Sequence, residues 1–340
     1  MKKLVFLREN PNAHGGAELY LKWLKQSLEK LGLKGSVRGY EGRQKGVSWL
    51  KALRFNAQAK AKKHSDELYF SLARIDSADI YRTDDGVHKI YRNTKKLWFL
   101  NPLNFIHPYL EKKCFNNAKC IIAISQMVKN QIIECYKIKA DKIKVLYNGV
   151  EFPEILDKIR AKKELCDELK IDASLPLILF VGSGFKRKGL KEILLALNEI
   201  KSPYNAVFVG KDKRLEYYKT LAKNLGVNAI FTGARNDAKR FFEASDIFML
   251  LATYEPFGLA ILEAMSYENA VIASTNFGAS ELLENDFIAS DFKQASKILS
   301  KLLENSQLQK QNANENRQKS RKFSLENNAK ETLELIKSYL

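Results

Sequence analysis

Two glutamates, Glu255 and Glu263, stand eight positions apart where an apolar run ends and a helix is predicted to begin. The helix start would turn the backbone amides of Phe257, Gly258 and Leu259 toward an anion. A carboxylate placed as Glu263 is can accept two hydrogen bonds from a vicinal diol such as ribose. Two carboxylates beside an anion site are costly unless they bind hydroxyl groups. The pattern therefore argues against a purely structural role, and helix capping is the alternative.

A basic loop, residues 180–189, follows another apolar run. It carries two glycines, Gly182 and Gly184, and then three consecutive cations at a predicted helix start: Lys186, Arg187 and Lys188. Such a loop can cradle a diphosphate, and a solvated basic loop is the alternative. No Lys-Ser or Lys-Thr pair closes the segment, so it is not a P-loop.

A glycine pair, Gly15-Gly16, lies between the first predicted strand and the first predicted helix. Two glycines let the backbone approach a ligand closely, although a tight turn accounts equally well for the pair. The segment lacks the spacing Gly-x-Gly-x-x-Gly, so the dinucleotide-binding fingerprint is absent.

The elements that must position these loops are short apolar strands that alternate with amphipathic helices along the whole chain. The predicted strands are residues 3–7, 68–72, 80–83, 120–124, 143–147, 177–181, 206–209, 229–232, 247–251 and 270–273. This alternation predicts an α/β protein with two doubly wound domains that meet near residues 149–153. Ligands of such sheets lie at the carboxyl ends of strands, where all three loops stand. Residues 307–322 are predicted to form an exposed helix, and residues 325–340 a final amphipathic helix.

Length and charge restrict the function further. The 340 residues suit two domains. Residues 1–150 contain 29 basic and 13 acidic residues, hence 29 − 13 = +16 of the total charge of +18. This half is expected to attract an anionic partner such as nucleic acid, acidic lipid or phosphorylated saccharide.

No apolar run reaches the roughly 18 residues of a membrane-spanning helix. The apolar run at the start is too short for a secretory signal, and the four cysteines predict free thiols in a reducing cytoplasm.

Glu255 and Glu263 have the spacing of the E-x7-E signature. In this feature the chain resembles the retaining, nucleotide-sugar-dependent glycosyltransferases with the GT-B fold, in particular those of family 4. Further similar segments follow in the family's order: Gly15-Gly16-Ala17-Glu18, Ala123-Ile124-Ser125, Val145 to Val150, Lys188-Gly189, Phe231 to Arg235 and Ala244-Ser245-Asp246. The resemblance covers the whole chain. It implies an acceptor-binding Rossmann-like domain over residues 1–150 and a nucleotide-sugar-binding one over residues 151–322. Residues 323–340 would form a helix that crosses back to the first domain.

Two stretches, residues 181–189 and 81–88, are similar to the lipopolysaccharide core glucosyltransferase I group. That group transfers glucose from UDP-glucose to the first core heptose. The usual Gly-Arg of the family is Gly182-Ser183 here, so Arg187 would supply the second cation beside Lys188. The resemblance further implies that Arg235 lies on the base side of the donor.

According to the same resemblance, Asp85 and His88 would lie beside the transferred sugar and would be catalytic residues together with Glu255. For His88 alone, an exposed loop histidine is the alternative. The pair Asp84-Asp85 could be mistaken for a metal site. Arg187, Lys188 and a helix terminus would already neutralise the leaving diphosphate, so we expect no metal and no other cofactor. UDP-sugar would be a substrate, and the lipid A-core would carry the acceptor.

A basic and aromatic segment, residues 88–113, suits an anionic membrane surface. The expected contacts are Arg92, Lys95, Lys96, Lys112 and Lys113, with Trp98 and Phe99 dipping into the interface. Single-stranded nucleic acid and ordinary core packing are the alternatives, but no nucleic-acid-binding motif is present. The resulting hypothesis is a cytoplasmic, metal-independent hexosyltransferase, peripheral on the inner face of the inner membrane. One alternative is a family 4 transferase that uses another UDP-sugar or another cell-surface acceptor. The remaining alternatives are a UDP-N-acetylglucosamine 2-epimerase and a basic nucleic-acid-binding protein.

Overall fold

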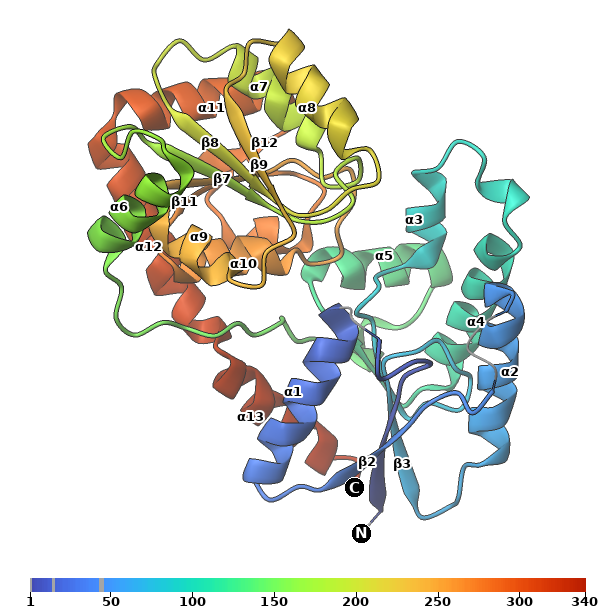
Figure 1. Cartoon of the computed structure of the whole chain (residues 1–340). Coiled ribbons are helices and arrows are strands. Elements are labelled where there is room, and N and C mark those ends of the chain that lie inside the picture. Colours follow the sequence, from blue (N-terminus) through green and yellow to red (C-terminus); the bar gives the residue numbers. More distant parts are fainter. Residues whose placement is uncertain (1, 14–15, 43–45) are drawn as a thin grey trace. The chain divides into compact units, whose positions relative to one another are not determined.

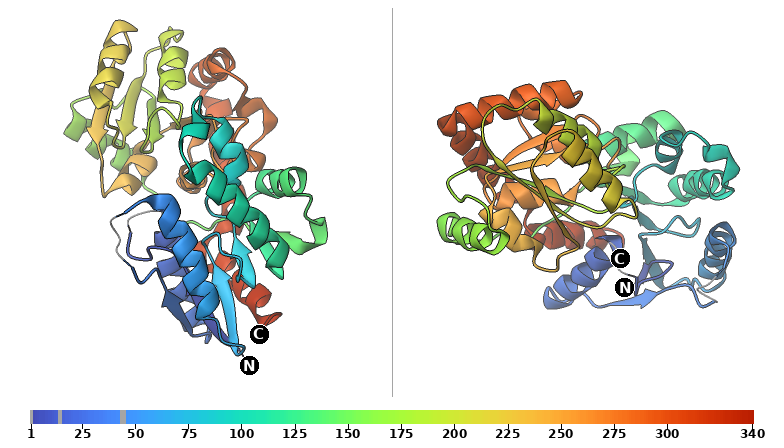
Figure 2. Two further views of the ribbon diagram at one scale, coloured as in Figure 1. Left: turned by 90° about the vertical axis from the view of Figure 1, so that its right-hand side faces the viewer. Right: turned by 45° about the horizontal axis from the view of Figure 1, so that its top comes forward.

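The computed structural model describes residues 2–13, 16–42 and 46–340. The chain divides into two compact units, one made of Met1–Gly149 with Glu326–Leu340 and the other of Val150–Leu325. The sequence had placed the divisions after residues 150 and 322. Each unit contains its own parallel sheet with helices on both faces (Figures 1 and 2). The predicted α/β class with two doubly wound domains is therefore confirmed.

The first sheet has six parallel strands in the order β2-β1-β3-β4-β5-β6. Their bounds are β1 Lys3–Leu7, β2 Gly35–Arg38, β3 Glu67–Ser71, β4 Ile80–Arg82, β5 Cys120–Ala123 and β6 Ile143–Val145. The strand predicted over residues 3–7 is confirmed. The strand β2 escaped prediction because it is a mostly exposed edge strand that lacks a buried apolar run.

The helices of the first unit are α1 Gly16–Lys30, α2 Ser48–Ala61, α3 His88–Asn93, α4 Leu103–Asn117, α5 Gln126–Tyr136 and α13 Leu325–Lys337. The last of these comes from the far end of the chain. Its Leu333 and Ile336 are buried in one hydrophobic cluster with Leu24 and Leu28 of α1. Figure 1 shows α13 beside α1. Burial of this apolar stripe explains why the C-terminal helix joins the first unit.

The second sheet has the order β12-β11-β10-β7-β8-β9 and is also parallel throughout. Its strands are β7 Leu177–Val181, β8 Asn205–Val209, β9 Ala229–Gly233, β10 Ile247–Leu250, β11 Ala270–Ser274 and β12 Ile288–Ala289. The helices are α6 Lys158–Leu169, α7 Leu190–Asn198, α8 Leu215–Asn224, α9 Ala238–Ala244, α10 Leu259–Ser266, α11 Phe292–Glu304 and α12 Ser306–Ser320. The strands β8, β10 and β11 and nearly all of β7 are buried, as the inner strands of a parallel sheet covered on both faces are, whereas the edge strand β9 is half-buried.

The strand order contains one reversal point in each sheet. In the first, the chain leaves β1 for β2 on one side and returns to β3 on the other. In the second, it runs from β7 through β8 to β9 and then returns to β10 beside β7. At such a switch point the two neighbouring loops diverge and open a crevice at the carboxyl ends of the strands. The loops after β1 and β3, and those after β7 and β10, are therefore the expected ligand sites.

The helix α12 differs from its prediction. It was expected to be exposed, but one polar face is buried and contains Asn312 and Asn316. The side-chain oxygen of Asn312 accepts a hydrogen bond from Val271 N at 3.2 Å, and Asn316 Nδ2 donates to Asn269 O at 3.2 Å. These amides bind backbone groups near β11, so a polar sequence packs against the sheet. In the described part of the chain, every helix is too short or too polar to cross a bilayer.

Candidate functional site

The loop after β7 is held in a compact turn that directs its cations toward β10. Asp212 Oδ2 accepts a hydrogen bond from Phe185 N at 2.7 Å. Gly189 caps α7 with a positive φ of 73°, and a Cβ on it would lie 1.8 Å from Leu251 O. Only glycine allows this approach of two backbones. The start of α7 therefore lies directly against the loop after β10.

The loop after β10 is fixed on two sides. Thr253 N donates to Arg187 O at 3.1 Å, which connects it to the loop after β7. Glu255 N donates to Asn276 O at 3.0 Å, and Gly278 N donates to Glu255 O at 3.1 Å. These two bonds form a short parallel bridge with the segment after β11. Glu255 is thus anchored through its backbone, and its carboxylate is free to meet charges.

The Glu255 carboxylate lies between the two cations predicted to bind diphosphate. Lys188 Nζ is 2.7 Å from Glu255 Oε2, and the Arg187 guanidinium donates to the same oxygen. Burial alone would raise the pKa of Glu255, but Lys188 and Arg187 outweigh it and hold the pKa below its ordinary value. Three predicted residues from two distant loops therefore form one ionised cluster at the switch point of the second sheet.

Glu263 lies inside α10 and has a different environment. Among the described residues, no donor is recorded within hydrogen-bonding distance of its carboxylate, and burial raises the pKa of this group. A half-buried carboxylate without a donor is left available for a ligand. The structure thus separates the two glutamates of the signature into a neutralised one and an unpaired one.

The start of α10 is formed as the sequence predicted. Gly258 caps the helix with φ 94°, and the helix begins at Leu259. A Cβ on Gly258 would lie 2.8 Å from the ring of Phe277 and 3.5 Å from Glu255 Cγ. The Glu255 side chain therefore packs across the capping glycine, beside the amino end of α10. Phe257 is buried, and its carbonyl accepts from Ala279 N at 2.7 Å.

Of the other predicted donor-binding residues, Arg235 lies in the second unit but is not part of this cluster. The Arg235 guanidinium pairs with Asp237 at 2.7 Å and with Glu168 at 3.2 Å, so its partners belong to the start of α9 and to α6. Gly15 lies outside the described residues. Gly16 is the exposed first residue of α1. Their proposed contacts with a donor remain predictions.

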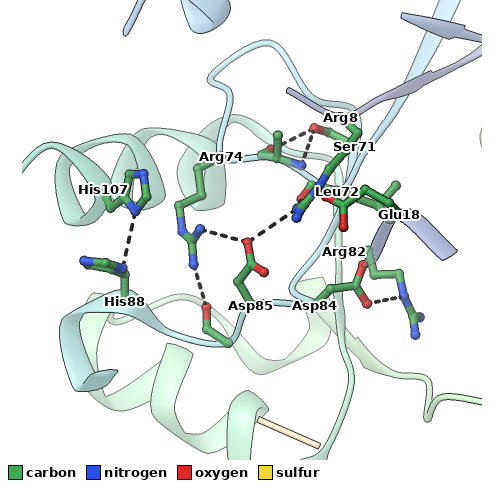
Figure 3. A network of polar contacts seen from close by, with 12 residues as sticks. Arg8, Glu18, Ser71, Leu72, Arg74, Arg82, Asp84, Asp85, His88 and His107 are labelled. Carbon is green, nitrogen blue, oxygen red and sulfur yellow. Dashed lines mark hydrogen bonds and ion pairs between the residues drawn. The ribbon is translucent and has the colours of Figure 1, made fainter. Parts of the chain in front are cut away.

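A second polar cluster lies at the switch point of the first sheet (Figure 3). Asp85, in the turn after β4, accepts from Arg8 at 3.4 Å and from Arg74 at 3.2 Å. Arg8 follows β1 and is also paired with Glu18 of α1 at 2.7 Å. Burial would raise the pKa of Asp85, but Arg74 and Arg8 outweigh burial and lower it. These residues and His107 line a pocket of about 200 Å³.

The support of this cluster is a fully buried glutamate, Glu111 of α4. Its Oε1 lies 2.8 Å from Arg74 Nε and accepts from His88 N at 2.7 Å, and its Oε2 accepts from the Tyr136 hydroxyl at 2.6 Å. A buried charge with three donors is well satisfied. Glu111 therefore fixes Arg74, and through Arg74 the position of Asp85.

His88 is not an exposed loop histidine. It is the first residue of α3, it is buried, and both of its ring nitrogens have partners. Nε2 lies 2.9 Å from Asn104 Oδ1, and Nδ1 lies 3.3 Å from His107 Nδ1. Burial and the positive charge of Arg74 lower the pKa of His88. Because both ring nitrogens are bonded within the protein, the contact of His88 with the transferred sugar remains a prediction.

The basic and aromatic segment presents apolar side chains to solvent. Leu97, Phe99 and Leu100 are 63%, 52% and 68% exposed. Trp98 instead packs under the guanidinium of Arg92, which lies 4.2 Å from the ring centroid and donates to Asn104 O. The structure therefore engages Arg92 and Trp98 internally. The exposed apolar residues, together with Lys95, Lys96, Lys112 and Lys113, form the outer surface of this segment.

Sequence reasoning missed several residues of the two clusters, namely Arg8, Arg74, His107, Glu111 and Asp212. Arg8, Arg74 and Asp212 each follow a strand closely, so the rule that ligands lie at carboxyl ends of strands could have found them. Glu111 and His107 lie in the middle of α4 and carry no comparable signal.

Two family models match the chain. Residues 161–319 match the family described as Glycosyl transferases group 1, and residues 68–152 match Glycosyltransferase Family 4. An uncharacterized glycosyltransferase of Methanocaldococcus jannaschii, MJ1069, is 30% identical over 227 residues, or 62% of this chain and 56% of that protein. The chain spans about half the length of the curated relatives it matches. The chain is therefore glycosyltransferase-like in both of its units.

Solved structures show the same fold over almost the full length. WaaG, a glycosyltransferase involved in lipopolysaccharide biosynthesis, has a TM-score of 0.79 at 19% identity and covers 98% of this chain and 99% of its own. Anabaena Alr3699/HepE in complex with UDP-glucose has a TM-score of 0.75 at 20% identity, with coverage of 99% and 100%. At these identities the likeness shows the fold, which is GT-B.

Proposed function

We propose that this chain is a retaining hexosyltransferase that moves glucose from UDP-glucose onto a heptose of the lipopolysaccharide inner core. The observation that carries the proposal is the meeting of Glu255, Arg187 and Lys188 at the switch point of the second sheet. Two cations beside an ionised carboxylate, with an unpaired Glu263 in the adjoining helix, suit a sugar diphosphate with a ribose diol.

The charged residues of this site in the second unit have distinct roles in the proposal. Lys188 and Arg187 hold the diphosphate and offset the charge that develops on departing UDP. Glu263 accepts both ribose hydroxyl groups, which explains why its carboxylate has no donor of its own. Glu255 accepts hydroxyl groups of the transferred sugar and remains ionised because the cations stay beside it. The helix start at Gly258 adds backbone donors on the same side.

The fold neighbours support the donor class and the acceptor class in part. HepE was solved with UDP-glucose, and WaaG acts in lipopolysaccharide biosynthesis. The resemblance of residues 181–189 and 81–88 to the core glucosyltransferase group points to the same pair of substrates. The acceptor would lie over the first unit, where Asp85 is 44% exposed in the pocket after β1 and β3.

We further propose that the enzyme works as a peripheral protein on the inner face of the inner membrane. The support is the outer surface of residues 95–113, where Leu97, Phe99 and Leu100 are exposed and four lysines of the same segment are exposed as well. Exposed apolar side chains and cations in one segment are suited to an anionic lipid surface. The first unit has a net charge of +15, since residues 1–149 carry 29 − 13 = +16 and residues 326–340 add two basic and three acidic residues, hence 16 + 2 − 3 = +15.

The deciding experiment is a donor screen without acceptor, followed by transfer. The purified protein is incubated with UDP-glucose, UDP-galactose and UDP-N-acetylglucosamine, and UDP release is measured. A heptose-terminated inner-core glycolipid is then added, and the anomeric configuration of the product is read by NMR. We expect UDP-glucose to be used and an α-linked product. Use of a different UDP-sugar supports the wider family 4 alternative, and release of free N-acetylmannosamine supports the epimerase.

A nucleic-acid-binding function makes a different prediction. In a filter-binding assay at physiological salt, a basic binding protein would retain single-stranded nucleic acid, and UDP-sugar would not compete. We expect no retention that survives this salt concentration. Strong retention together with no donor hydrolysis would overturn the transferase proposal.

A further inference from the structure

The hydrogen-bond chain from Trp98 to His107 fixes the tautomers of two histidines. Asn104 Nδ2 lies 2.6 Å from the backbone oxygen of Trp98, which can only accept, so Asn104 Oδ1 must face His88. An amide oxygen also only accepts, so His88 Nε2 carries the proton of that bond. Neutral His88 then has a lone pair on Nδ1.

The next bond in the chain follows from this lone pair. His88 Nδ1 lies 3.3 Å from His107 Nδ1, and one of the two atoms must donate. Because His88 Nδ1 is the acceptor, His107 Nδ1 carries the proton. His107 Nε2 is therefore left with a bare lone pair. Burial, Arg74 and His88 lower the pKa of His107 to about 3, so the ring is neutral.

This lone pair belongs to a residue that lines the pocket of the first unit. In Figure 3 the ring nitrogen of His107 that is not bonded to His88 points away from it. Among the described residues, no donor to His107 Nε2 is recorded. The groups facing the pocket from the other elements are Arg8, Arg74, Asp85, Glu9 and Glu18.

The charges of the pocket define what it can bind. Its two guanidinium groups are already paired, Arg8 with Glu18 and Asp85, and Arg74 with Glu111 and Asp85. The lining contains two cations and three carboxylates, of which Glu9 is also paired with Lys51 at 3.2 Å. A phosphate would have to displace Asp85 and face the remaining carboxylates. A hydroxyl group meets no such cost, since it can donate to Asp85 and accept from the arginines.

From these contacts we infer that the pocket binds a neutral sugar ring of the acceptor, and that His107 Nε2 accepts a hydrogen bond from one of its hydroxyl groups. His88 and Asn104 are positioning residues, which hold His107 in the tautomer that exposes its acceptor atom. The inference rests on the proposed transferase function for the identity of the ligand as an acceptor. The phosphate groups of the acceptor would then bind outside this pocket.

The first test reads the tautomers and the ligand class without any turnover. Long-range ¹H–¹⁵N NMR spectra of the ¹⁵N-histidine protein should show His88 protonated at Nε2 and His107 at Nδ1. The methyl glycoside of heptose should shift the His107 Nε2 resonance, whereas its 4-phosphate and inorganic phosphate should not. His64, which is exposed, is the control signal. A proton on His107 Nε2, or a shift produced by phosphate, would overturn the inference.

The second test uses kinetics to separate this inference from the proposed function. His107→Leu should raise the acceptor KM by about tenfold, the cost of one lost hydrogen bond, and the change is judged against the same variant's rate of donor hydrolysis. His107→Gln retains an acceptor atom and should stay within about threefold of wild type. His64→Leu should change neither quantity. If no variant or wild type uses a donor, the transferase proposal fails, and the NMR titration alone decides the ligand class. Unchanged acceptor KM in His107→Leu would refute the role of this residue.

Discussion

Lys188 and Glu255 belong to loops on either side of one strand reversal, and the lysine Nζ lies 2.7 Å from the glutamate Oε2. In this state the carboxylate neutralises a cation that a diphosphate would need. In the proposed function, a donor therefore shares or displaces Glu255 as it binds. The same ion pair holds the pKa of Glu255 below its ordinary value, so its carboxylate stays an acceptor for the sugar hydroxyl groups that the proposal assigns to it.

The two glutamates should respond differently to neutral substitution. Glu255→Gln removes a competitor for Lys188 and Arg187, so UDP affinity should equal or exceed that of wild type, while turnover falls by at least about tenfold. Glu263→Gln should weaken UDP by about 1.5–3 kcal/mol, because a charged acceptor is lost. Isothermal titration with UDP and a UDP-release assay measure the two quantities. Equal losses of UDP affinity in both variants would contradict the assignment.

The three cations of the loop after β7 should not contribute equally to turnover: Lys188 and Arg187 should matter, and Lys186 should not. Lys188→Ala and Arg187→Ala should each lower turnover by about tenfold or more, because each offsets charge on departing UDP. Lys186→Ala is the matched control, since this lysine is exposed in the same loop, and it should retain wild-type turnover. The reaction should also continue in excess EDTA. Activity that disappears with chelator and returns with Mg²⁺ or Mn²⁺ would show that metal independence is wrong.

The close approach of Gly189 to the loop after β10 should contribute to the free energy of unfolding. In Gly189→Ala a Cβ would lie 1.8 Å from Leu251 O at a φ of 73°, so the two loops must separate. We expect a loss of about 2 kcal/mol or more, beyond the roughly 1 kcal/mol of left-handed strain. Gly226→Ala has a φ of 67° and open space, and it should show only the strain. Thermal unfolding followed by circular dichroism compares the two, and similar losses would refute the steric argument.

The buried Glu111 of α4 should contribute far more to the free energy of unfolding than the exposed Glu164 of α6. Glu111→Gln leaves Arg74 without its buried partner, and we expect a loss of about 3–5 kcal/mol. Glu164→Gln removes an exposed pair with Arg160 within α6, and it should cost about 0.2–1 kcal/mol. All three tryptophans, Trp23, Trp49 and Trp98, lie in the first unit. Urea unfolding followed by tryptophan fluorescence therefore reports on Glu111→Gln, and circular dichroism, which senses helices of both units, measures the smaller loss in Glu164→Gln. Equal losses in the two variants would contradict the importance of the buried pair.

Membrane attachment should depend on the outer surface of residues 95–113. The quadruple variant with glutamate at Lys95, Lys96, Lys112 and Lys113 should lose binding to anionic vesicles, since each cation near the surface contributes about 1 kcal/mol. Wild-type binding should fall as salt rises and be absent with zwitterionic vesicles. Donor hydrolysis should be unaffected in the variant. Arg92 is left in place because it packs on Trp98. Undiminished vesicle co-sedimentation of the variant would contradict a membrane role for this surface.

Local sequence predicted most of the strands and the loops that carry chemistry. Apolar runs such as residues 177–181 and 247–251 predict buried strands because a parallel sheet is covered on both faces. The observed β7 ends where predicted, and β10 ends one residue earlier. Gly258 at a predicted helix start, with Glu255 before it and Glu263 after it, indicated an anion site without any tertiary information. Two strands were missed: β2 has only one apolar side chain, Val37, and lies partly exposed at the sheet edge, and β12 has only two residues, too few to give an apolar run.

Pairing across long sequence separations was decided by the tertiary structure alone. The sequence determined that Lys188, Arg187 and Glu255 each follow a strand, but only the strand order β10-β7 places them together. Likewise, His88 alone suggested an exposed loop residue, whereas packing of α3 against α4 buries it and leaves His107 to face the pocket. Short-range patterns set local conformation through backbone preferences and burial. The charge and tautomer of a side chain depend on neighbours that the fold brings from elsewhere.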